Sequence, residues 1–127
     1  MLNKAPNPNN KRFDLIGRTA KFGEDVIAFA QSLEQNRVNR PIISQFIDAG
    51  TSIGANYMEA DGAESRKDFE HKIGICRKEA KESLHWLRMI AKANPQRAQE
   101  ARVLWKEAQE LALIFSSIIH HSREKKR

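Results

Sequence analysis

The feature that most constrains the fold is a helical spacing of apolar residues, which runs along most of the chain and breaks at three points. Apolar side chains recur three, four or seven positions apart in four segments, residues 15–33, 43–57, 69–91 and 104–118. This spacing places them on one face of an α-helix. The breaks EQNRVNRP, DGAES and KANPQ are rich in turn formers. No segment alternates apolar and polar residues as a half-buried strand does.

Residues that start or stop helices flank these segments. Asp14 suits an N-cap or first-turn acid, and Pro41 suits the first turn of a second helix. Ser65, with Asp68 three positions later, is a variant of the capping box, and Pro95 closes the third helix near residue 93 and opens the fourth. Helices of about 20–30 residues with short loops predict an all-α protein, a single-domain, antiparallel up-down-up-down four-helix bundle.

The net charge of +6 is concentrated at the two ends of the chain. Residues 1–12, rich in Asn and Pro, predict a flexible basic N-terminal tail, and residues 123–127 predict a basic C-terminal tail. The four-helix bundle between them, residues 13–122, is neutral as a whole but polarised. Residues 13–64 hold eight acids and four bases, whereas residues 65–92 hold four acids and eight bases.

Cysteine usage and hydropathy indicate the compartment. The chain has a single cysteine, so an internal disulfide is excluded. It contains no run of 18 apolar residues, so no membrane span is predicted, and its N-terminus lacks the apolar core of a signal peptide. We therefore expect a cytoplasmic protein with no membrane association.

Apolar residues outside the expected core faces favour self-association. Ile75, Trp86 and Met89 gather opposite the core face of the third helix, and Leu113 and Ile114 lie outside the core face of the fourth. Scattered surface apolar residues are common, but a tryptophan flanked in this way favours a protein contact. A partner subunit is the simpler account of this excess.

The segment AGTSIGANYMEA, residues 49–60, contains features unusual for a helix. Gly50 and Gly54 lie on one side and each cost about 1 kcal/mol relative to alanine, so close approach of another helix backbone is expected to offset them. Asn56 and Glu59 follow one turn later, where they can hydrogen-bond across the contact. We expect all four at an oligomer interface. The alternative is that the glycines meet a neighbouring helix of the same bundle.

Residues 51–90 resemble a known family. Ser52, Ile53, Gly54, Ala55 and Asn56, followed by Glu59, match its S-I-[PG]-A-N segment with a following acid. Its other motifs match Ser65, Asp68, Phe69, Ala80, Trp86 and Leu87. The family is that of the four-helix-bundle proteins of 23S rRNA intervening sequences, which includes the accessory variability determinant of diversity-generating retroelements. Gly54 stands where many members have proline.

The resemblance implies a small all-α subunit that assembles into a ring, typically a homopentamer. It also implies association with RNA or DNA and, through the retroelement member, with a reverse transcriptase or another protein. Most family members have no assigned activity, and a shared fold does not transfer function.

Residue patterns for catalysis, metals or cofactors are weak. Glu82 and His85 match one half of a carboxylate di-iron motif, but no second copy exists. Cys76 falls on the core face of the third helix, where a small apolar filler is expected. We expect no enzyme activity, no cofactor and no metal site.

Five basic residues of the third helix form the candidate nucleic-acid site, and we call them the basic stripe: Arg66, Arg77, Lys81, Arg88 and Lys92. The last four fall within about 60° around the helix, with Arg66 on the same side. Such a row can follow a phosphate backbone, or it can be a solvated face or pair with acids on neighbouring helices. Because the first two helices are rich in acids, salt bridges between subunits are a further alternative. We expect a homo-oligomeric scaffold with weak, sequence-independent RNA or DNA binding. The alternative is a structural protein-interaction module with no nucleic-acid role.

Overall fold

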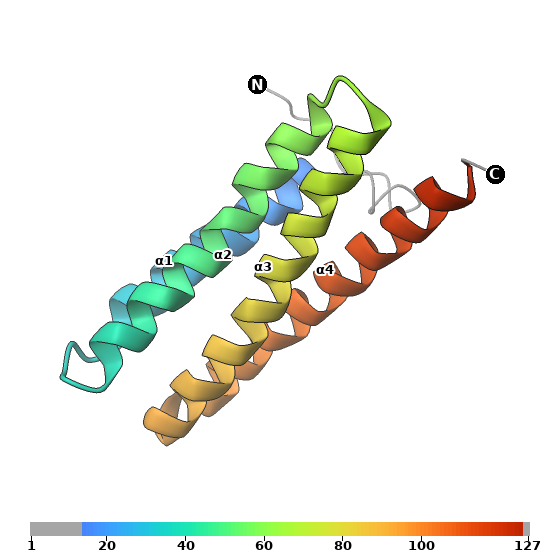
Figure 1. Cartoon of the computed structure of the whole chain (residues 1–127). Coiled ribbons are helices and arrows are strands. Elements are labelled where there is room, and N and C mark those ends of the chain that lie inside the picture. Colours follow the sequence, from blue (N-terminus) through green and yellow to red (C-terminus); the bar gives the residue numbers. More distant parts are fainter. Residues whose placement is uncertain (1–13, 126–127) are drawn as a thin grey trace.

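The computed structural model of the chain describes residues 14–125. These form four helices, α1 (Leu15–Ser32), α2 (Asn39–Asp61), α3 (Arg66–Ala93) and α4 (Ala98–Glu124), with a short 3-10 turn, η2 (Pro95–Arg97), before α4. The helices alternate in direction and are joined by short connections (Figure 1). The predicted all-α four-helix bundle is confirmed. The expected N-terminal tail and the last two residues of the C-terminal tail lie outside the described residues.

The helix boundaries follow local hydrogen bonds. The side-chain oxygen of Ser65 accepts the backbone N–H of Asp68 at 3.0 Å, which is the predicted N-cap of α3. Helix α2 begins two residues before Pro41, because the side-chain oxygen of Asn36 accepts the backbone N–H of Asn39 at 2.8 Å. Pro95 opens η2 rather than α4 itself.

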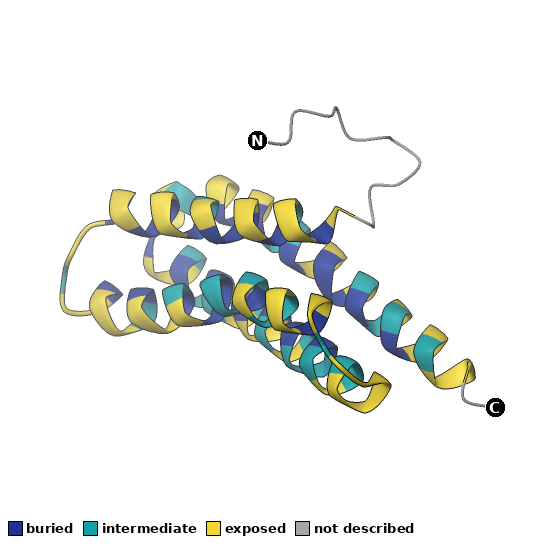
Figure 2. Ribbon diagram, turned by 90° about the horizontal axis from the view of Figure 1, so that it is seen from above, coloured by how far each residue is buried: buried dark blue, intermediate teal, exposed yellow. Residues whose placement is uncertain are grey.

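The core lies along the inward faces of all four helices, where the buried residues gather (Figure 2). On α3 the predicted core face is buried at Ile73, Cys76, Ala80 and Leu87 and half-buried at Phe69, Leu84 and Ala91. The Cys76 thiol donates a hydrogen bond to the carbonyl oxygen of Ile53 at 3.5 Å. Burial raises the pKa of this thiol to about 12, so it stays protonated at neutral pH and acts as a core filler.

Helix α1 touches α4 less extensively than the other neighbouring helices touch one another. An ion-pair cluster bridges this weaker contact. The Arg18 Nε and Nη2 atoms donate to the two carboxylate oxygens of Glu107 at 2.7 and 2.9 Å, and Nη2 lies 2.7 Å from Glu110 Oε1. These carboxylates raise the pKa of Arg18, and the two-pronged geometry favours a defined position of α1 against α4.

Candidate nucleic-acid interface

The basic stripe runs along α3. Arg66, Lys81, Arg88 and Lys92 are exposed, and Arg77 is half-buried. The four residues from Arg77 to Lys92 follow one another at spacings of four, seven and four, so they share one face of the helix. At 1.5 Å per residue, these four cover about 22 Å of the helix axis.

No acid of the described residues 14–125 forms a salt bridge with any member of the basic stripe. Several acids are engaged elsewhere, since Glu107 and Glu110 bind Arg18, Glu59 binds Lys72, and Glu100 binds Arg97. Within one chain, the stripe is therefore not neutralised by neighbouring helices.

One acid lies within the stripe. Glu70 falls between Arg66 and Arg77 along α3, and its carboxylate accepts a hydrogen bond from the Ser122 hydroxyl of α4 at 2.6 Å. This carboxylate separates Arg66 from the other four members. The continuous basic surface therefore extends from Arg77 to Lys92.

An apolar groove lies between α1 and α2. It has a volume of about 340 Å³, and small residues line it, Ala20 and Gly23 on α1 and Gly54 and Ala55 on α2. Three large apolar side chains border it and remain 42–55% exposed: Ile16, Ile27 and Met58. A floor of small residues between exposed apolar walls is a shape that accepts a helix.

The two glycines predicted at an oligomer interface contact α1 of their own chain. A methyl group on Gly50 would lie 2.6 Å from Val26 Cγ2, and one on Gly54 would lie 3.4 Å from the Thr19 carbonyl oxygen. Gly50 is buried, so the intrachain alternative accounts for this glycine. Gly54 packs against α1 and also lines the α1–α2 groove.

The polar interface candidates also have partners in the same chain. The Asn56 side chain donates to the Ser52 carbonyl oxygen of its own helix at 2.9 Å. Glu59 accepts from Lys72 Nζ at 2.5 Å, which connects α2 to α3 and raises the pKa of the lysine. These contacts give both residues intrachain roles, and a role between subunits stays a prediction.

The remaining interface candidates lie on α3 and α4, away from the groove. Leu113 is 65% exposed, whereas Ile75, Trp86, Met89 and Ile114 are half-buried. The Trp86 ring meets the His85 ring edge-on at a centroid distance of 4.7 Å. Trp86 and Ile114 pack against the core, so the apolar surface on α3 and α4 consists of Leu113 and the exposed parts of the half-buried side chains, in addition to the apolar surface of the α1–α2 groove.

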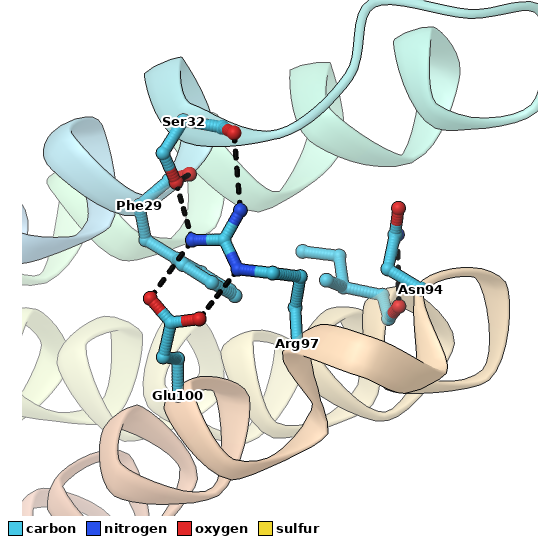
Figure 3. Close-up of polar contacts among 6 residues, drawn as sticks. Phe29, Ser32, Asn94, Arg97 and Glu100 are labelled. Carbon is cyan, nitrogen blue, oxygen red and sulfur yellow. Dashed lines mark hydrogen bonds and ion pairs between the residues drawn. The ribbon is translucent and has the colours of Figure 1, made fainter.

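Polar contacts close the end of the bundle that lies opposite the α2–α3 connection. Asn39 and Asn94 are buried, and each side-chain amide donates to the other's carbonyl oxygen, at 2.9 and 3.0 Å. Nearby, the Arg97 guanidinium donates to the Ser32 hydroxyl and carbonyl oxygens, pairs with Glu100 and lies 5.3 Å from the Phe29 ring centroid (Figure 3). These contacts join α1, α2, α3 and the start of α4.

Sequence reasoning missed Asn39, Asn94, Arg18 and Arg102. Asn39 and Asn94 resembled ordinary turn residues, since each lies next to a loop and they are 55 positions apart. Helical periodicity also did not indicate that Arg88 of α3 and Trp105 of α4 would line the same pocket.

Metal-binding geometry is absent from the described part of the chain, residues 14–125, where no three His, Cys, Asp or Glu side chains gather closely enough to hold an ion. None of the helices in this part of the chain is long and apolar enough to cross a membrane.

Comparison with known proteins supplies the family context. The family model described as 23S rRNA-intervening sequence protein matches residues 11–117. A similar solved structure is that of a protein of unknown function from the S23 ribosomal protein family of Bacteroides thetaiotaomicron. It has a TM-score of 0.79 and 27% sequence identity, and the match covers 87% of this chain and 98% of that one. A search of the curated proteins gave no significant match.

Proposed function

Because the chain belongs to the 23S rRNA-intervening sequence protein family, we propose that it is a homo-oligomeric four-helix scaffold that binds RNA or DNA through the phosphate backbone. The observation that carries this proposal is the run of basic side chains from Arg77 to Lys92, none of which pairs with an acid of the described residues. Cations without intrachain partners are free to replace the counterions of a phosphate backbone.

Self-association is the second part of the proposal, with a pentamer as the expected form. The α1–α2 groove is concave and differs from the apolar surface on α3 and α4. A contact between two different faces is head-to-tail, and such contacts form closed rings when the rotation between subunits closes. A ring would repeat the basic stripe once per subunit, and several weak sites on one assembly strengthen binding to a long nucleic acid.

Charge reversal in the stripe tests nucleic-acid binding. Arg77→Glu combined with Lys81→Glu is expected to lower affinity for RNA or DNA at least about 100-fold, because two attractions become repulsions. If four or five stripe residues contact phosphates, log K should fall against log salt with a slope near −4, and the double variant should reduce that slope by about two. Filter binding at several salt concentrations measures both quantities.

The matched control is Lys21→Glu with Arg37→Glu. These substitutions also reduce the formal net charge from +6 to +2, but they lie on α1 and the loop that follows it. The control should keep most of the affinity. If both double variants lost affinity to the same extent, the overall charge would be the cause. If Arg77→Glu/Lys81→Glu kept its full affinity, the basic stripe would not be part of the binding site. No binding by the native protein at 50 mM salt would contradict the proposal as a whole.

A groove variant tests assembly. Ala55 is exposed and lines the α1–α2 groove, so Ala55→Glu introduces a charge where a partner helix would pack and leaves the core of the chain unchanged. We expect this variant to keep its helical circular dichroism and to sediment as a monomer at concentrations where the native protein is an oligomer. An unchanged mass by light scattering would argue against the groove as the interface.

A structural protein-interaction module without nucleic acid remains the second candidate, and the exposed side chains around the α1–α2 groove favour it. The salt-dependence experiment distinguishes the two candidates. A module that docks only protein should form the oligomer and show no nucleic-acid binding even at low salt.

A further inference from the structure

A pocket opens between α3 and α4, near the connection that joins them. Its volume is about 290 Å³, and four of its lining residues are apolar: Leu87, Ala91, Ala98 and Ala101. This volume of about 290 Å³ lies just below the range of small-molecule sites, about 300–1,000 Å³. The pocket is therefore suited to a single planar ring system rather than to an entire dinucleotide cofactor.

The remaining lining residues are an aromatic ring and two cations. Trp105 is half-buried on α4, and Arg88 of α3 and Arg102 of α4 are exposed. Neither arginine forms a salt bridge with another residue in the described range 14–125. The nearest acids along α4, Glu100 and Glu107, are engaged by Arg97 and Arg18. Both guanidinium groups are thus free to meet an anionic ligand.

We propose that this α3–α4 pocket receives one unpaired base of a single-stranded nucleic acid, with the base against Trp105 and the flanking phosphates at Arg88 and Arg102. This inference rests on the proposed function, because Arg88 is also a member of the basic stripe and a strand that follows the stripe reaches the pocket. An aromatic side chain stacks with any base, and arginines beside it contact the backbone. Bases within a duplex are already stacked and paired, so the pocket selects single strands.

Fluorescence of Trp105 gives a direct test. Trp86→Phe leaves Trp105 as the only tryptophan of the chain. In this background, unstructured oligouridylate and oligothymidylate are expected to quench the emission on binding, because the base stacks on the indole. An RNA duplex of the same length should bind through the stripe without comparable quenching. The two single-stranded probes compare RNA with DNA, since oligouridylate carries the ribose 2′-hydroxyl and oligothymidylate carries the thymine methyl group instead.

Two variants test the pocket independently of fluorescence. Trp105→Leu should weaken single-strand binding about tenfold or more and change duplex binding less than about twofold. Arg102→Gln should weaken single-strand binding severalfold. It should also reduce the slope of log K against log salt by about one, as expected for the loss of one phosphate contact. Lys106→Gln is the matched control, since Lys106 lies one turn along α4 and is exposed but does not line the pocket.

The outcomes separate this inference from the function on which it rests. If the native protein binds neither single strands nor duplex, both are overturned. If it binds nucleic acid but the Trp105 emission is not quenched and Arg102→Gln behaves like Lys106→Gln, the proposal that the pocket receives a base is overturned. The basic stripe alone then accounts for binding. Quenching and Arg102→Gln decide the question even if Trp105→Leu does not fold.

Discussion

Replacing Gly50 by alanine is expected to destabilise the bundle by about 2 kcal/mol or more, even though alanine is the better helix former. A Cβ at this position would lie 2.6 and 2.9 Å from the two methyl groups of Val26, which is fully buried on α1. Valine has one strongly preferred rotamer in a helix and cannot turn away, so α1 and α2 must move apart. Overpacking of this kind costs about 1–3 kcal/mol and occasionally more, which exceeds the gain of about 1 kcal/mol from propensity.

A matched control is available within the same chain. Gly74 lies on α3, and a methyl group there would meet nothing within 4 Å. Gly74→Ala should therefore stabilise the protein by about 0.5–1 kcal/mol. Urea unfolding followed by circular dichroism measures both changes, and Val26→Ala should recover part of the loss caused by Gly50→Ala. If Gly50→Ala were as stable as the native protein, close packing would not be the reason for this glycine.

Replacing Asn94 by leucine is expected to cost about 2–3 kcal/mol. The Asn94 side chain exchanges two hydrogen bonds with Asn39 and donates a third to the Ile90 carbonyl oxygen. Both asparagines are buried, and among the described residues no buried side-chain polar atom lacks a partner. The variant leaves the carbonyl oxygen of the Asn39 side chain buried without its donor, and an unpaired buried group costs about 1–3 kcal/mol.

The double variant Asn39→Leu/Asn94→Leu tests this reason. Replacing both partners by apolar groups of similar shape removes the unpaired atom, so the double variant should be less destabilised than the sum of the single variants. We expect a coupling of at least about 1 kcal/mol in chemical denaturation. Strict additivity would show that the two amides do not act as a pair.

Helix positions and core faces followed from local chemistry. Ser65 caps α3 because its own side chain reaches the N–H of Asp68, three residues away. Ile73, Cys76, Ala80 and Leu87 are buried because their spacing repeats with the helix. Such features depend only on residues within one or two helical turns of each other, so the spacing of residues along the sequence is sufficient to predict them. Pro41 lies in the first turn of α2, as predicted, and the hydrogen bond from the Asn39 backbone N–H to the Asn36 side chain adds a local contact at the start of this helix.

The partners of the candidate site residues depend on long-range packing. No local pattern distinguishes a glycine that meets Val26 of the same chain from one that meets a second subunit. The same holds for Glu59, whose partner Lys72 lies across the α2–α3 connection. Charge counts indicated that acids of α1 and α2 could pair with the basic stripe, within one chain or between subunits. The folded chain pairs Asp25 with Lys21 and Glu59 with Lys72, and pairing between subunits stays a prediction.

The sequence by itself determined that this protein is a four-helix bundle and that α3 bears a row of basic residues, because a helix repeats every few residues and both features lie within single helices. Only the tertiary structure decided that Asn39 meets Asn94, that Arg18 connects α1 to α4, and that Trp105 and Arg88 line the same pocket. Those contacts join residues far apart in the chain, and they depend on how each helix is rotated and shifted against its neighbours.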